Sequence, residues 1–279
     1  ALGIGANTGM FSVMNSIILR PLPYGNSEEL DRFYRATPEE RSGAISPADY
    51  LDFQAAAADY GEVAAYSYTG MSLSEPRTPP ELRPGVRVSV NYFEVLRVSP
   101  ILGRGFLPEE AIRGNHRVLL LSHRIWKDRF GGRAGVIGET IRVDGMPHEI
   151  IGVLPRSYSD WRYMGWIDLF RPLGLTPEES RERTDTIMHV VGRPHPGLEK
   201  EAKHAFLQTF SERLAREYPE VNAASQWWTE PLNLVVADYG ARRTLAMIMG
   251  LACFVLLIAC SNLANLMLAR TISRSRELA

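Results

Sequence analysis

Two long stretches without charged residues bracket the chain, and both predict membrane helices. In the second stretch no charged residue lies between Arg243 and Arg270, and residues 245–269 read LAMIMGLACFVLLIACSNLANLMLA. About 20 apolar residues are enough for a helix to cross roughly 30 Å of hydrocarbon. A soluble helix of this length would need a polar face, which the stretch lacks. We therefore predict a transmembrane helix over residues 239–270.

The first nineteen residues also carry no charge. Small residues recur there on one side of a helix, a pattern that lets two membrane helices pack closely, at Gly5, Gly9, Ser12 and Ser16. We predict that residues 1–20 form the C-terminal part of a first transmembrane helix, which ends before the prolines that follow. The alternative is a buried N-terminal helix of a soluble domain.

Residues 21–238 alternate strand-like and helix-like segments, which predicts a mixed α/β (α+β) domain between the two helices. Ser46 and Ser122 are the expected N-caps of helices that reach about residues 58 and 130. Asp144-Gly145 is typical of a tight hairpin turn. A short helix is expected at 92–96. Strands are expected at residues 30–36, 63–73, 83–90, 118–121, 140–143, 148–153, 187–191 and 232–236.

The clearest helix of the polar region covers residues 198–218 and ends at Pro219. Its charged residues, Lys203 among them, are expected to point away from the core. One apolar stripe is expected to face the core, formed by Leu198, Ala202, Ala205, Phe206, Phe210 and Leu214.

Charge is nearly balanced, with 31 Lys and Arg, 32 Asp and Glu, and a formal net charge of −1. This balance excludes a nucleic-acid-binding protein that depends on a basic surface. Three of the arginines next to the apolar stretches would lie on the domain side of the membrane and three on the opposite side, so charge alone does not orient the chain. These arginines are Arg20, Arg242, Arg243, Arg270, Arg274 and Arg276.

No familiar catalytic motif is present, so we predict no catalytic residue, no cofactor and no metal site. Both cysteines, Cys253 and Cys260, lie in the apolar stretch. The six histidines lack the spacing of a helical metal pair, and we interpret them as surface or capping residues. Carboxylate pairs follow prolines that start helices, where they complement the helix dipole, at Asp49/Asp52, Glu109-Glu110 and Glu178-Glu179. Arg104, between two glycines, is interpreted as part of a turn.

Polar side chains inside the apolar stretch are interpreted as contacts between membrane helices. Asn262 and Asn265 lie three residues apart on one helix face, and an amide in lipid needs a partner. A polar substrate path is the alternative interpretation. Trp227-Trp228 is consistent with aromatic residues at the membrane interface, with a surface patch that faces a partner, or with the core of the domain.

Seven stretches, in this order along the chain, carry a family resemblance: ALGIGANTGMFSVMNSIILRPLPY, SPADYLDFQ, VSVNYFEVLRVSPILGRGFLPEE, VLLLSHRIWKDRFGG, IGETIRVDGMPHEIIGVLP, LAREYPEVN and LLIACSNLANLMLARTISRSRELA. Together they resemble MacB/FtsX-type ABC transporter permeases, in particular the duplicated permeases first noticed in acidobacteria. Each motif is structural and moderately specific, and their order over the whole chain makes the resemblance strong.

The resemblance implies an extracytoplasmic domain at 21–238 with two small lobes, the second inserted at roughly 95–180. It implies a location in the bacterial inner membrane and a cytoplasmic segment from 271–279 that begins, near Arg270, Arg274 and Arg276, the region facing a separate ABC ATPase. Further implied partners are membrane lipid, a second permease copy or an internal duplication, and a periplasmic adaptor. The implied activity is to couple ATP hydrolysis by that ATPase to movement of the extracytoplasmic domain.

Two other function classes remain open at the level of sequence. A membrane-tethered binding or scaffold module without a transport role is the first alternative, and a membrane-anchored enzyme, for which no residue constellation speaks, is the second. The chain starts without Met and ends on SRSRELA without a helix cap. We therefore expect a fragment of a longer protein, and the family resemblance implies two further membrane helices after Ala279.

Overall fold

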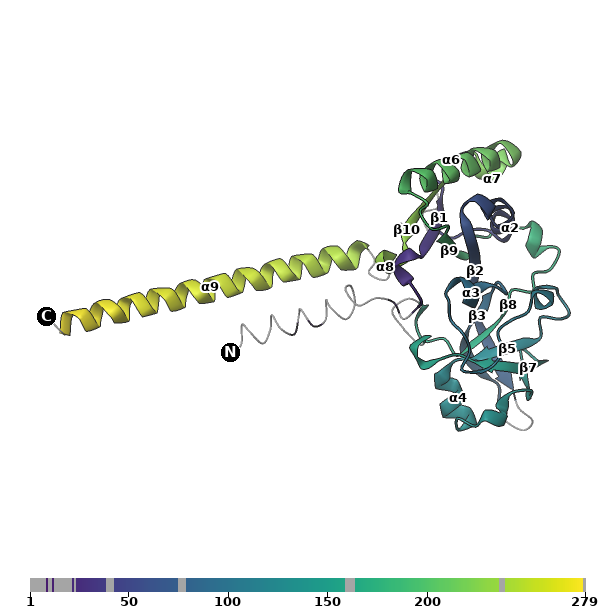
Figure 1. Ribbon diagram of the computed structural model, residues 1–279, viewed down its shortest axis with the longest axis horizontal. Helices are drawn as coiled ribbons and strands as arrows, with labels where there is room; N and C mark the ends of the chain where they lie inside the picture. The colour runs from purple at the N-terminus through teal and green to yellow at the C-terminus, as the bar shows by residue number, and fades with distance from the viewer. Residues whose placement is uncertain are drawn as a thin grey trace. The chain divides into compact units, whose positions relative to one another are not determined.

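The computed structural model describes residues 9, 12, 22, 24–38, 43–74, 79–158, 164–235 and 239–277. The chain divides into two compact units, and Figure 1 shows the long helix of one and the mixed fold of the other. One unit is Leu22–Asn233, which we call the domain, and the other combines Ala1–Pro21 with Leu234–Ala279.

The described residues of the domain form a ten-stranded mixed sheet. The strand order is β10-β1-β9-β2-β3-β8-β5-β7-β4, and β6 pairs with β2 and β7. The pairs β3–β8 and β5–β7 are parallel, whereas the other pairs are antiparallel. The strands are β1 Asp31–Ala36, β2 Gly61–Ser74, β3 Glu81–Val88, β4 Leu102–Gly103, β5 Val118–Leu121, β6 Thr140–Val143, β7 Met146–Val153, β8 Leu169–Pro172, β9 His189–Pro194 and β10 Gln226–Pro231.

Helices cover the sheet at both of its ends, with α6 at one end of the domain in Figure 1 and α4 at the other. The α-helices are α2 Pro47–Ala56, α3 Tyr92–Val95, α4 His123–Phe130, α6 Lys200–Glu217, α7 Pro219–Asn222, α8 Leu232–Val235 and α9 Tyr239–Glu277. Short 3₁₀ turns lie at Ser27–Glu29, Ala57–Asp59, Pro108–Ala111, Ala134–Val136, Arg156–Tyr158 and Glu179–Arg181.

Two helices begin at the serine caps that the sequence predicts. The Ser46 hydroxyl accepts a hydrogen bond from the Asp49 amide at 3.2 Å, and Pro47 occupies the first turn of α2. The Ser122 hydroxyl accepts one from the Ile125 amide at 3.3 Å and starts α4. Both bonds satisfy amides that have no partner within the helix, so local chemistry alone fixes these two starts.

The predicted hairpin between β6 and β7 is confirmed. Val143 pairs with Met146 across the two-residue turn, and the turn residues Asp144 and Gly145 have φ angles of 52° and 77°. Two positive φ angles match the mirror-image turn that joins twisted antiparallel strands, and glycine adopts such angles without steric cost.

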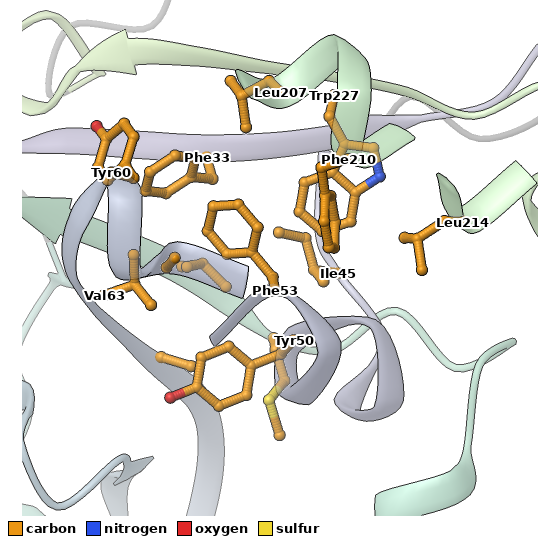
Figure 2. Packing of buried hydrophobic residues seen from close by; sticks show 14 of the residues in the cluster. Phe33, Ile45, Tyr50, Phe53, Tyr60, Val63, Leu207, Phe210, Leu214 and Trp227 are labelled. Atoms are coloured by element: carbon orange, nitrogen blue, oxygen red, sulfur yellow. The ribbon is translucent and has the colours of Figure 1, made fainter. Parts of the chain in front are cut away.

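One hydrophobic core lies between α2, α6 and the β10-β1-β9-β2 part of the sheet (Figure 2). Phe53 of α2 lies at its centre, with ring centroids 4.7 Å from Phe33, 5.1 Å from Phe210 and 5.3 Å from Trp227. Aromatic pairs at these distances add about 0.5–1.5 kcal/mol each beyond their buried area. The packing therefore fixes α2 and α6 against the strand pair β1–β10.

A second hydrophobic core lies at the other end of the sheet. Ile125, Trp126 and Phe130 of α4 pack there. The strands contribute buried residues from β2, β5, β6, β7 and β8, namely Met71, Leu73, Leu119, Leu121, Val143, Ile150, Val153 and Leu169. Because the 14-residue strand β2 contributes to both cores, one sheet supports both ends of the domain.

The buried face of α6 differs in part from the predicted stripe. Leu207, Phe210 and Leu214 are buried, whereas Ala202 and Ala205 are exposed. Lys203 was expected to point away, but its ammonium lies 2.5 Å from the buried Asp31 carboxylate. Leu198 and Phe206 also pack against the first core, so the predicted stripe is confirmed except at its two alanines.

The last strand of the domain is not where the sequence predicts it. Residues 232–236 were expected to be a strand, but Leu232–Val235 is the short helix α8. The strand is Gln226–Pro231 instead, paired antiparallel with β1. Residues 226–231 contain both tryptophans and end in Pro231, and Trp227 enters the first core. The packing of this aromatic side chain outweighs the strand propensity of the later apolar residues.

The second unit contains the 39-residue helix α9. Met247–Leu268 within it is 22 residues long and, by length and composition, apolar enough to cross a membrane. The helix continues past residue 270 to Glu277.

Candidate functional site

The chain enters and leaves the domain at one corner of the sheet, where β1 begins and β10 ends. Asp31, the first residue of β1, pairs with Pro231, the last residue of β10. The Leu232 amide then donates a hydrogen bond to the Leu30 carbonyl at 2.7 Å. We call residues 25–31 and 230–232, with Arg193 and Lys203, the β1–β10 corner.

Asp31 is the buried charge of this corner, with 4% of its surface exposed. Its Oδ2 accepts hydrogen bonds from the Tyr60 hydroxyl and the Lys203 ammonium, both at 2.5 Å. Burial, and then the neighbouring Asp31 charge, raises the pKa of Tyr60, so its hydroxyl stays protonated and donates. Three elements are thereby tied together: β1, α6 and the segment between α2 and β2.

Arg193 of β9 holds the chain segment that leads into β1. Its guanidinium is buried, and it donates to the carbonyls of Gly25 at 2.7 Å and Asn26 at 3.1 Å. It also donates to the Val95 carbonyl at 3.0 Å and to Glu29 Oε2 at 2.8 Å. Burial lowers the pKa of Arg193, and these four acceptors compensate the lost hydration.

The corner also borders a cavity of about 540 Å³. Asp31, Arg193, Lys203 and Pro231 contribute to its lining. Its lining holds four carboxylates and three Arg or Lys side chains, so these charges largely compensate one another.

The carboxylate pair Asp49/Asp52 holds the fold together. The Arg183 guanidinium donates to Asp49 Oδ1 at 2.5 Å and to Asp52 Oδ2 at 2.7 Å. The same group lies 3.3 Å from the centre of the Tyr218 ring. Arg35 of β1 lies 3.5 Å from Asp49 on the other side. Asp49 is thus buried between two arginines, although its Oδ2 accepts no hydrogen bond from a described residue.

The other carboxylate pairs also have structural partners. Arg104 donates to Glu110 through two nitrogens, at 2.7 and 3.1 Å, while Glu110 accepts from the Leu107 amide at 2.8 Å. Arg104 is thus part of a turn, as the sequence indicates. Glu179 accepts from the Thr176 amide at 2.8 Å and pairs with Arg87 at 2.9 Å.

Two of the six histidines, which looked scattered in the sequence, line one cavity in the domain: His116 and His148. His189 lies elsewhere, accepts a hydrogen bond from Arg32 at 2.9 Å, and contacts the Tyr66 ring. Burial beside Arg32 lowers the pKa of His189 to about 4, so it is neutral at physiological pH. Within the described ranges, no group of three or more His, Cys, Asp or Glu residues could hold a metal ion.

The residues predicted to pack membrane helices lie in the second unit. Asn262 and Asn265 are exposed on α9, and their role as helix contacts stays a prediction. Gly9 and Ser12 are helical and exposed, while Gly5 and Ser16 fall outside the described residues. Among the arginines predicted to face an ATPase, Arg270 is exposed, and α9 also contains Arg274 and Arg276.

The two adjacent tryptophans belong to the domain. Trp227 is buried in the first core, where it contacts Phe53 and Phe210. Trp228 lies on the opposite face of β10 and stacks on Tyr34 of β1 at 5.2 Å with an interplanar angle of 10°. Both rings therefore hold β10 to the rest of the sheet.

Sequence reasoning did not find the corner residues Asp31, Arg193 and Lys203. Each is a charged residue inside or beside a predicted element, and such residues are usually exposed. The pairing of β1 with β10 joins positions about 200 residues apart, which no local pattern reveals.

Comparison with known proteins shows which family this chain resembles. The family model of the MacB-like periplasmic core domain matches residues 1–204. No match to a curated protein was found.

Three solved structures share the fold at low sequence identity. A domain of a protein described as a permease from Porphyromonas gingivalis has 12% identity and a TM-score of 0.55, and covers 75% of this chain and 91% of its own. The extracellular domain of the noncanonic ABC-type transporter YknZ from Gram-positive bacteria has 15% identity and a TM-score of 0.51. The match covers 71% of this chain and 99% of the YknZ domain. The periplasmic region of MacB from Actinobacillus actinomycetemcomitans has 14% identity and a TM-score of 0.53, and covers 76% and 91%.

The family match covers well over half of the chain, including most of the domain. One helix of the described residues is apolar enough to span a membrane. The chain belongs to the MacB-like periplasmic core domain family of ABC transporter permeases, and it is an inner-membrane protein with an extracytoplasmic domain.

Proposed function

We propose that this chain couples ATP hydrolysis by a separate ATPase subunit to movement of its extracytoplasmic domain. The observation that carries the proposal is the continuity of α9, which runs unbroken from Tyr239 to Glu277. At about 1.5 Å per residue the helix is about 58 Å long, whereas the hydrocarbon core of a bilayer is roughly 30 Å thick. A rigid rod of this length reaches past the bilayer on both sides and can carry a displacement across it.

The β1–β10 corner supports the same proposal from within the domain. Because Asp31 pairs with Pro231, the segments that precede β1 and follow β10 leave the domain next to each other. Two membrane helices that bracket the domain would both act on this corner. The buried hydrogen bonds of Asp31, and those of Arg193 to the segment that leads into β1, would transmit this displacement directly to the sheet.

The proposal includes the finer organisation that the family resemblance implies. Two hydrophobic cores at opposite ends of the sheet support a description as two lobes, the second near residues 95–180. The arginine-rich end of α9, from Arg270 onward, would face the ATPase. A second permease copy or internal duplication, a periplasmic adaptor and membership of the acidobacterial subgroup are further parts of the proposal.

A proline at position 245 tests the lever directly. Leu245→Pro removes a backbone hydrogen bond inside α9 and kinks it, at a cost of about 3 kcal/mol of helix stability. We expect the ATPase assembled with this variant to hydrolyse ATP, while ATP no longer changes the tryptic cleavage pattern of the domain. The measurement is limited proteolysis of the full chain with its copurifying ATPase, with and without ATP.

Leu245→Ala is the matched control, because alanine preserves the helix and should leave the ATP-dependent cleavage pattern intact. If Leu245→Pro keeps the wild-type response to ATP, the lever proposal is wrong. If the wild-type domain itself gives the same pattern with and without ATP, the tethered scaffold without a transport role becomes the better account.

A further inference from the structure

The cavity between the β6–β7 hairpin and the loops around residues 113–117 and 173–179 is unusually rich in arginine. It measures about 500 Å³ and is lined by Arg87, Arg113, Arg117 and Arg171 but by only two carboxylates among the described residues. These carboxylates are already engaged. Glu179 pairs with Arg87 at 2.9 Å, and Asp144 pairs with Arg171 at 3.2 Å.

The remaining two arginines lack a carboxylate. Arg113 donates a hydrogen bond to the Gly174 carbonyl at 3.4 Å, and neither it nor Arg117 has an ion pair with a described residue. Both are exposed at the cavity's rim. With four cations and two carboxylates, the lining carries an excess of two positive charges when the histidines are neutral. This excess favours an anion of similar charge.

The two histidines of the cavity differ in tautomer. His116 Nδ1 accepts a hydrogen bond from the Gly114 amide at 2.9 Å, which leaves its Nε2 as an N–H donor. His148 Nδ1 lies 3.0 Å from the Met146 carbonyl, to which it must donate. Its Nε2 is therefore an acceptor.

The Nε2 acceptor of His148 lacks a hydrogen-bond donor among the described residues. His148 is 3% exposed, and its Nε2 is buried without a hydrogen-bond partner in the described part of the chain. Burial and the nearby Arg171 lower the pKa of His148, which keeps Nε2 unprotonated. A buried polar atom without a partner costs about 1–3 kcal/mol. Because Nε2 is closed to solvent in this structure, an O–H group of a ligand reaches it, and removes this penalty, only when the surrounding cavity wall shifts.

The local backbone geometry indicates that the cavity is a preformed binding site. Gly174 has a φ of +50°, and a Cβ added there would lie 2.6 Å from the His116 ring. Only glycine lets the 173–176 loop approach His116 so closely. The positions of the His116 ring and of the Gly174 carbonyl that Arg113 contacts are thus set by one residue.

From these observations we propose that the cavity binds a hydrogen phosphate group. Arg113, Arg117 and the His116 Nε2–H donate to its charged oxygens, and its P–O–H donates to His148 Nε2. Sulfate has the same shape and charge but no O–H at neutral pH, so it leaves His148 Nε2 unsatisfied. The phosphate group is either a free anion or the headgroup of a lipid such as phosphatidic acid.

Isothermal titration calorimetry of the full chain in detergent tests the proposal at about pH 7, where the lowered pKa values keep His116 and His148 neutral and a phosphate monoester still retains part of its P–O–H form. Sodium phosphate tests the free anion. Short-chain phosphatidic acid, compared with phosphatidylcholine of the same chain length, tests the headgroup. We expect phosphate, or phosphatidic acid alone if the source is lipid, to bind, and phosphate to bind about tenfold or more tightly than sulfate.

Variants locate the binding in this cavity. Arg113→Gln combined with Arg117→Gln should weaken binding by about tenfold or more, because two charged donors are lost. Arg216→Gln removes an exposed charge of α6 outside the cavity and should change the affinity less than about twofold. Binding of neither phosphate nor phosphatidic acid overturns the proposal. So does equal affinity for sulfate and phosphate in the wild type, or wild-type affinity in the double variant.

Discussion

At the scale of single residues, buried charged groups stabilise this domain through ion pairs and hydrogen bonds. Asp31, Asp49 and Arg193 are buried, and each has at least two charged or polar partners. A buried charge costs several kcal/mol unless partners replace its hydration. Removing one partner should therefore cost more than the same change at the surface.

Lys203→Met tests this at the β1–β10 corner. The change keeps most of the side chain's volume but leaves the buried Asp31 carboxylate with Tyr60 as its remaining close donor. Because Lys203 is partly exposed, we expect a loss of about 1–3 kcal/mol in the free energy of unfolding. The measurement is denaturant unfolding of the full chain in detergent, followed by tryptophan fluorescence.

Lys200→Met is the matched control, because Lys200 lies in the same helix but is exposed. It should change the free energy of unfolding by less than about 0.5 kcal/mol. Equal effects of the two variants would show that the Asp31 ion pair does not hold the corner.

At the scale of elements, prediction succeeded where the signal was local. The serine caps of α2 and α4 and the Asp144-Gly145 turn each depend on two to four adjacent residues, and all three are confirmed. Strand β8, Leu169–Pro172, was not predicted, because it includes Pro172 and a proline counts against a strand in sequence patterns. The boundary between β10 and α8 depends on the partner strand β1, which local sequence does not reveal.

Two glycines at which an added Cβ meets no neighbouring atom separate backbone strain from crowding. A Cβ added at Gly145 or at Gly105 would meet no atom within 4 Å, but only Gly145 of the two has a positive φ, +77°. Gly145→Ala should therefore lower the free energy of unfolding by about 1–2 kcal/mol, while Gly105→Ala should be neutral or slightly stabilising. Denaturant unfolding compares the two, and equal destabilisation would contradict a strained turn.

At the scale of the whole molecule, the apolar segment and the α/β class were evident from the sequence, and the family match confirms the resemblance. The architecture of the site was not. The β1–β10 corner joins positions about 200 residues apart, and the arginine-rich cavity collects residues from four segments between 87 and 179. Such sites arise from the order of strands in the sheet, so no periodicity or motif in the chain predicts them.

The central claim is that the nucleotide state of the ATPase reaches the domain through α9 and the β1–β10 corner. β10 is an edge strand with one neighbour, β1, among the described strands, so its hydrogen bonds should respond first when the chain that follows it is displaced. The β6–β7 hairpin, which forms part of the second core, serves as the internal reference.

Amide hydrogen exchange of the full chain, assembled with its copurifying ATPase, measures this most directly. The account predicts that trapping the ATP-bound state changes the exchange rate of Gln226–Pro231 by about tenfold or more, equivalent to about 1.4 kcal/mol, while the hairpin changes little. Identical exchange of β10 with and without ATP would contradict it.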